Sequence, residues 1–123
     1  MSGQLSNFQI PNFISESTGQ NITSAAISFF NIRGLWSAQF SFTGDGIGFL
    51  KIQVSIDPDN IAPVSWSDLA NAGVLLIAPD DVLFDVGFPF YNWARFVYSR
   101  TSGTGIINGR INIKENDSWR RLQ

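Results

Sequence analysis

The stretch that most constrains the fold runs from Asn92 to Lys114, with the sequence NWARFVYSRTSGTGIINGRINIK. Two runs rich in aromatic and β-branched residues flank the polar segment 101–105, whose glycines permit the positive φ of a tight turn. In the second run, apolar residues or glycine occupy every other position, namely Ile107, Gly109, Ile111 and Ile113. A period of two is typical of a half-buried antiparallel strand, so this stretch predicts a β-hairpin.

A second hairpin is predicted for residues 35–56. Its first arm alternates apolar and polar side chains, and Gly44-Asp45-Gly46 then reverses the chain. The residues expected to face the core are Trp36, Ala38, Phe40 and Phe42 in the first arm and Leu50, Ile52, Val54 and Ile56 in the second. The opposite face is polar in both arms, which indicates a sheet with one solvated side.

The remaining segments predict further short strands. Residues 21–32 indicate a strand that is bulged or covered on both sides. Residues 74–78 indicate another strand, and residues 82–86 continue the same edge beyond the turn at Pro79. The aromatic segment 87–91 contains Pro89, which places it in a loop or at a sheet edge. Together the elements predict an all-β fold of about seven or eight strands, an antiparallel β-sandwich of jelly-roll or immunoglobulin-like topology.

The length of 123 residues fits one domain. We divide the chain into an N-terminal arm at residues 1–20, a β-sandwich domain at 21–115 and a C-terminal tail at 116–123. The first residues are either a loose end or an arm that docks on a neighbouring subunit. The tail, with Trp119 beside two arginines, is either disordered or an anchor on another protein.

Composition favours adhesion over chemistry. Charged residues make up 15% of the chain and aromatic residues 14%, so we expect part of the surface to be covered by a partner. The net charge is -2 and the basic residues are scattered, which disfavours binding to nucleic acid or to an anionic membrane. The N-terminus lacks the pattern of a signal peptide, and no apolar stretch approaches a bilayer span, so we expect synthesis in a cytosol.

Candidate catalytic groups are scarce. The chain contains no histidine and no cysteine, which excludes a Ser-His-Asp or Cys-His arrangement and the usual zinc sites. The oxygen donors Asp57, Asp59 and Asn60 lie close together, but their spacing lacks the length and the closing glutamate of an EF-hand loop. Asp45, Asp80 and the Asp57 segment all adjoin Gly, Pro or Asn, where turn formation explains them. We therefore expect no enzymatic activity, no metal and no cofactor.

Several motifs in this order resemble those of small β-sandwich structural proteins from bacteriophage particles. The matching residues are Gly48, Leu50, Ile52, Gln53 and Ser55; Asp57 and Asp59; Trp66 and Leu69; Arg95, Phe96, Val97 and Tyr98; Ser102 to Gly105; and Lys114. The resemblance covers roughly residues 34–115. It implies a virion component, such as a capsid decoration, auxiliary capsid or head-fibre protein.

For such a role the expected partners are other virion proteins and further copies of the chain, with a trimer as a natural symmetric assembly. The expected location is the virion, after synthesis in the host cytoplasm. The residues expected to make these contacts are Phe8, Ile10, Phe13 and Trp119. The alternative is a carbohydrate-binding sandwich whose exposed rings stack on sugars, and its platform would be Phe88, Phe90, Tyr91 and Trp93.

Overall fold

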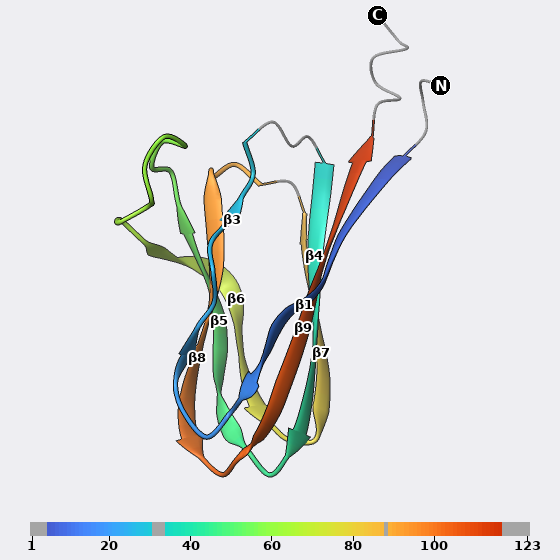
Figure 1. Ribbon diagram of the computed structural model, residues 1–123, viewed down its shortest axis with the longest axis vertical. Helices are drawn as coiled ribbons and strands as arrows, with labels where there is room; N and C mark the ends of the chain where they lie inside the picture. The colour runs from blue at the N-terminus through green and yellow to red at the C-terminus, as the bar shows by residue number, and fades with distance from the viewer. Residues whose placement is uncertain (1–4, 31–33, 88, 117–123) are drawn as a thin grey trace, which may run out of the picture.

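The computed structural model describes residues 5–30, 34–87 and 89–116. Within these ranges the chain forms nine strands and no helix, and hence no helix that could cross a membrane (Figure 1). The predicted all-β class is confirmed, whereas the predicted number of seven or eight strands is too low. The difference arises because residues 5–17 form a strand and because residues 21–32 contain two short strands in place of one.

The strands form two antiparallel sheets. The four-stranded sheet contains, in spatial order, β1 (Leu5–Ser17), β9 (Gly105–Asn116), β4 (Gly34–Gly44) and β7 (Asp80–Gly87). The five-stranded sheet contains β2 (Ile22–Thr23), β8 (Trp93–Ser102), β5 (Ile47–Ser55) and β6 (Ser67–Ile77), while β3 (Ile27–Ser28) also pairs with β8. Four pairs of consecutive strands therefore occupy corresponding positions in the two sheets, namely β1 and β2, β4 and β5, β6 and β7, and β8 and β9.

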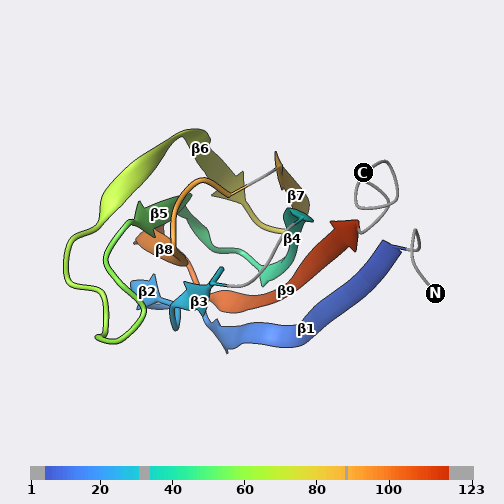
Figure 2. The same ribbon diagram turned by 90° about the horizontal axis from the view of Figure 1, so that it is seen from above.

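The two predicted hairpins are wrong in their pairing, although their strands are correct. β8 pairs with β5, whereas β9 pairs with β1 and β4, so the turn between β8 and β9 carries the chain from one sheet to the other. The same holds for β4 and β5, and for β6 and β7, which were expected to share an edge. Figure 2 shows the two sheets as separate layers with these connections between them.

The crossing turns are hydrogen-bonded to one another at one end of the molecule. The amide of Asp45 donates to the carbonyl of Thr104 at 2.9 Å, and the amide of Thr104 donates to the carboxylate of Asp45 at 2.9 Å. Gly44 and Gly103 adopt positive φ values of 89° and 75° in these turns. These two bonds pair backbone groups of neighbouring turns with each other at the point where the chain changes sheets.

The core lies between the sheets and contains the apolar faces that the alternation predicted. Trp36, Phe40, Ile111 and Phe96 are all buried, and the rings of Phe40 on β4 and Phe96 on β8 lie 4.7 Å apart. The predicted face of β9 is confirmed, since Ile107, Gly109, Ile111 and Ile113 are buried together. Side chains from the two sheets thus interlock across one continuous core.

Two local predictions need correction. Ile56 was expected to face the core, but β5 ends at Ser55 and Ile56 is 78% exposed. The chain turns there because the hydroxyl of Ser55 accepts a hydrogen bond from the amide of Asp57 at 3.1 Å. In residues 21–32, the backbone and side chain of Ser24 both bond to Phe96, which interrupts the ladder between β2 and β3.

Within residues 1–20, which were predicted to be an arm, Leu5–Ser17 form the edge strand β1. β1 pairs with β9 over most of its length, with an irregularity between Ile10 and Ile14 that contains Pro11. A proline in an edge strand with a bulge is a common arrangement, because its missing N–H interrupts pairing with a further strand. The far end of the predicted tail, including Trp119, lies outside the described residues.

Candidate interaction surface

The segment between β5 and β6, residues 56–66, is held in place by Asp57. Its carboxylate accepts hydrogen bonds from the backbone amides of Val64 at 2.8 Å and Ser65 at 2.9 Å. These bonds, first from Ser65 and then from Val64, lower the pKa of the Asp57 carboxyl below its ordinary value. Asp57, which was considered as a calcium ligand, therefore stabilises a turn by accepting bonds from amides seven and eight residues later in the chain.

The same segment is tied to the start of β8. The indole N–H of Trp93 donates to the carbonyl of Asp57 at 3.0 Å, and the side-chain amide of Asn92 donates to the carbonyl of Ile56 at 3.0 Å. The amide of Asn92 also donates to the carbonyl of Ser55 at 2.9 Å. Residues 56–66 and 89–92 consequently form one fixed unit at the end of the molecule opposite the crossing turns.

Four large apolar side chains of this unit are exposed to solvent: Ile56 (78% exposed), Ile61 (55%), Val64 (80%) and Phe90 (89%). We call this group of four residues the loop end. Single exposed apolar residues are common on protein surfaces. Here four of them lie on two segments that hydrogen bonds join to each other. A contact surface built on a preorganised segment loses little conformational freedom on binding. The loop end is therefore suited to adhesion to another protein.

A second exposed apolar group lies on the outer face of the five-stranded sheet. Phe49 on β5 is directly opposite Leu75 on β6, and Ile47 is opposite Ile77. Phe49, Leu75 and Ile77 are 43%, 59% and 59% exposed. These cross-strand neighbours form an outer patch that belongs to a different face from the loop end.

The rest of that outer face is polar and internally bonded. Arg95 lies over the ring of Trp66 at 4.3 Å and donates from its Nε to Gln53 at 2.9 Å. Gln53 and Lys51 both donate to the carboxylate of Asp68, at 3.0 and 3.1 Å. The bond from Gln53 and then that from Lys51 lower the pKa of Asp68. Arg95 is thus engaged by neighbouring side chains of the protein itself.

Among the described rings of the proposed carbohydrate platform, Phe90 alone is largely exposed. Phe90 is exposed, whereas Tyr91 is half-buried and its hydroxyl accepts a hydrogen bond from Trp36 Nε1 at 3.1 Å. Burial raises the pKa of Tyr91, and the bond from Trp36 partly offsets this. Trp93 packs edge-on against Phe30, with ring centres 5.7 Å apart. Phe88 lies outside the described residues.

The expected contact residues of the N-terminal segment pack against the protein's own core. Ile10 and Phe13 are both partly buried against the core, and the ring of Phe13 meets Phe96 edge-on at 6.2 Å. The backbone of Phe8 pairs with Ile113, and its side chain lies outside the description. None of the loop-end residues was among the expected subunit contacts, and Phe90 was named only for the carbohydrate alternative.

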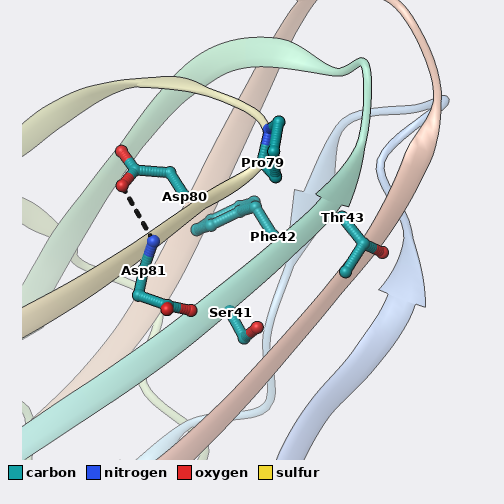
Figure 3. Close-up of a pocket in the computed structure, with 6 residues that line it drawn as sticks. All are labelled: Ser41, Phe42, Thr43, Pro79, Asp80 and Asp81. Carbon is teal, nitrogen blue, oxygen red and sulfur yellow. Dashed lines mark hydrogen bonds between the residues drawn. The ribbon is translucent and has the colours of Figure 1, made fainter.

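The hollow in Figure 3 lies where β4 ends and the turn into β7 begins. It has a volume of about 460 Å³ and is lined by Ser41, Phe42, Thr43, Pro79, Asp80 and Asp81. Within it the amide of Asp81 donates to the carboxylate of Asp80 at 2.8 Å. Asp80 therefore stabilises the turn, as Asp45 and Asp57 do in theirs, and as the sequence predicted for all three.

No protein-family model matches the chain, and no curated protein matches it. Solved structures do match. The SPBc2 prophage-derived protein YomS has a TM-score of 0.51 at 9% identity, covering 94% of this chain and 98% of that one. PirA has a TM-score of 0.46 at 14% identity, with 89% and 92% covered, and FLHE has a TM-score of 0.34 at 9% identity, with 94% and 99% covered.

Of these, the likeness to YomS indicates a shared fold. The chain therefore has an all-β fold similar to that of a prophage-derived protein, over nearly the whole length of both. At this level of identity a shared fold does not by itself carry a shared function.

Proposed function

We propose that this chain is a non-enzymatic structural protein of a bacteriophage particle, which binds neighbouring virion subunits as a decoration, auxiliary capsid or head-fibre component. The observation that carries this proposal is the loop end, where Ile56, Val64 and Phe90 are exposed on segments fixed by hydrogen bonds. Buried against a partner, apolar area contributes about 25 cal/mol per Å² before the costs of association.

The strand order supports the same proposal. Each sheet has the order expected of a jelly roll, with β1, β9, β4 and β7 opposite β2, β8, β5 and β6. This strand order supports the jelly-roll type of β-sandwich over the immunoglobulin type, and we propose the jelly-roll type. Jelly rolls are common in viral capsid and lectin domains. The fold likeness to a prophage-derived protein favours the phage setting over others.

The roles of the carboxylates support a non-enzymatic function. Asp45, Asp57 and Asp80 each accept a backbone N–H in a turn, so their oxygens stabilise local structure. Among the described residues, no group of three or more acidic side chains is placed to hold a metal ion. The partners in this proposal are other virion proteins and further copies of the chain, in the assembled particle.

The test is incorporation into virions of the phage that encodes the chain. Particles are purified with the wild-type chain, with Val64→Asp plus Phe90→Ser, or with the control Ile106→Ser, which changes an exposed apolar residue near the crossing turns. We expect the chain in intact particles and a several-fold loss for the loop-end variant alone. Absence of the wild-type chain from the particles, or equal incorporation of all three proteins, would refute the proposal.

A further inference from the structure

We infer that two copies of this chain join edge to edge, with β6 of each copy paired to β7 of the other copy. This inference goes beyond the proposed function, because it concerns a surface other than the loop end and is tested without a virion. It rests on the open edges of the two sheets, on the core between them, and on the charges along them.

The two sheets have open edges on the same side of the molecule. β6 ends the five-stranded sheet and β7 ends the four-stranded sheet, so the outer backbone groups of both face no further strand within the described ranges. Figure 2 shows β6 and β7 next to each other on one side. An unpaired strand edge is a template for pairing with another chain. This side of the molecule therefore offers two such templates at once.

The core is incompletely covered between these two edges. Several of the core residues on β6 and β7 are only partly buried, namely Leu69, Val74, Val82, Phe84 and Val86. A groove of about 350 Å³ lies between the strands and is lined by residues 69–72 and 83–86. A second copy on this side would remove these apolar side chains from water, which favours association.

The charges distinguish the two symmetric ways of placing that second copy. A two-fold axis perpendicular to the sheets pairs β6 with β6 and β7 with β7, whereas an axis parallel to the strands pairs each β6 with the other copy's β7. β7 carries Asp80, Asp81 and Asp85 and no basic residue, so a contact between two β7 strands would bring like charges together. Residues 69–77 of β6 carry no charge. The second arrangement, which pairs β6 with β7, therefore avoids the repulsion.

The same arrangement gives every strand an antiparallel neighbour. β7 follows β6 after the two-residue connection 78–79 and so runs back in the opposite direction. Rotation about an axis parallel to the strands keeps their directions, so β6 meets the other copy's β7 antiparallel, as elsewhere in both sheets. Because both edges of each copy are paired at once, the contact closes as a dimer. It therefore predicts a dimer in place of the trimer considered from the sequence.

Two exposed leucines would meet in this contact. Leu75 is 59% exposed on the outer face of the five-stranded sheet, and Leu83 is 65% exposed on the outer face of the four-stranded sheet. Leu75 lies two residues before the end of β6 and Leu83 three residues after the start of β7, so the two are at nearly the same level along the strands. Within one copy they lie on opposite faces of the sandwich, whereas in the dimer they lie on the same face of adjacent strands.

The absence of cysteine allows a direct test by crosslinking. Leu75→Cys and Leu83→Cys are prepared as separate full-length chains, one with a longer tag, then mixed, oxidised and separated on a non-reducing gel. The control mixture replaces Leu83→Cys with Ile106→Cys, because Ile106 is 49% exposed and lies on β9, which β4 separates from β7. We expect several-fold more mixed disulfide pair from Leu75→Cys with Leu83→Cys than from the control mixture.

Sedimentation of the unmodified chain provides the second measurement. We expect a dimer that dissociates on dilution, a dissociation constant at least tenfold higher for Leu75→Asp, and no change for Ile106→Asp. A monomer at every concentration or a trimer would overturn the inference, as would equal mixed crosslinking in the test and control mixtures. A predominant disulfide between two copies of Leu75→Cys would overturn it as well, because it would show that β6 pairs with β6.

Discussion

The indole N–H of Trp36 donates a hydrogen bond of 3.1 Å to the hydroxyl of Tyr91, which ties the start of β4 to the loop before β8. Trp36 is only 2% exposed, so no solvent can replace this partner. Tyr91→Phe should therefore destabilise the protein by about 1–3 kcal/mol, the cost of an unpaired buried donor. Urea denaturation measures the change. In a Trp36→Phe background, which removes the donor, the same substitution should cost much less.

Gly109 lies under the ring of Phe40. A Cβ built on Gly109 would lie 2.5 Å from Phe40 Cε1, and the two residues are paired across β9 and β4. Gly109→Ala should destabilise the fold by about 1–3 kcal/mol through overpacking. Combining it with Phe40→Leu should recover part of that loss, as measured by thermal or urea denaturation. A penalty that is the same in both backgrounds would show that the ring is not the obstacle.

The carboxylate of Asp57 should make stability depend on acidity. Because its pKa is lowered in the fold from the ordinary value of 3.8, its contribution is present above that value and is lost as the pH falls through the folded pKa. At neutral pH, Asp57→Asn should be less stable than wild type, and the difference should shrink when the pH is taken below about 3.8. Denaturation at a series of pH values measures this, with Asp59→Asn as the control for net charge. A difference that stays constant with pH contradicts the assignment.

Phe13 should contribute to the stability of the isolated chain, because its ring contacts Phe96 and packs against the core. We expect Phe13→Ala to destabilise the monomer by about 1–3 kcal/mol, less than for a fully buried ring, and Phe13→Leu to cost less. Denaturation at two protein concentrations distinguishes this role from that of a docking arm. For an arm, the substitution would weaken association and leave the stability of the monomer unchanged.

The sequence predicted the strands better than their partners. A period of two shows which side chains of a strand face the core, as it did for β4 and β9. It does not show whether two successive strands pair in a hairpin or lie in facing sheets, because both arrangements give the same pattern. Glycines with positive φ, such as Gly44 and Gly103, suit either connection. What decides the pairing is the contact between distant turns, and spacing along the chain does not reveal it.

The candidate surface was predictable only in part. The turn at Asp57 followed from its residue types, but its hydrogen-bond partners at Val64 and Ser65 lie seven and eight residues away, beyond local turn rules. The exposure of Ile56 depends on where β5 ends, and alternation extended one residue too far. Phe90 was named for the carbohydrate alternative because of its aromatic ring, and its exposure in the structure now places it among the loop-end residues.

The pairing of β1 with β9 bears on how the protein is made. During synthesis β1 emerges from the ribosome long before its partner β9. β4 also pairs with β9 and so also emerges before its partner. The four-stranded layer therefore cannot assemble until β9 has left the ribosome, and such long-range pairing is slow. Until then, the apolar face of β4 and the side chains of Ile10 and Phe13 lack their packing partners on β9, so the growing chain is most prone to aggregation just before β9 appears.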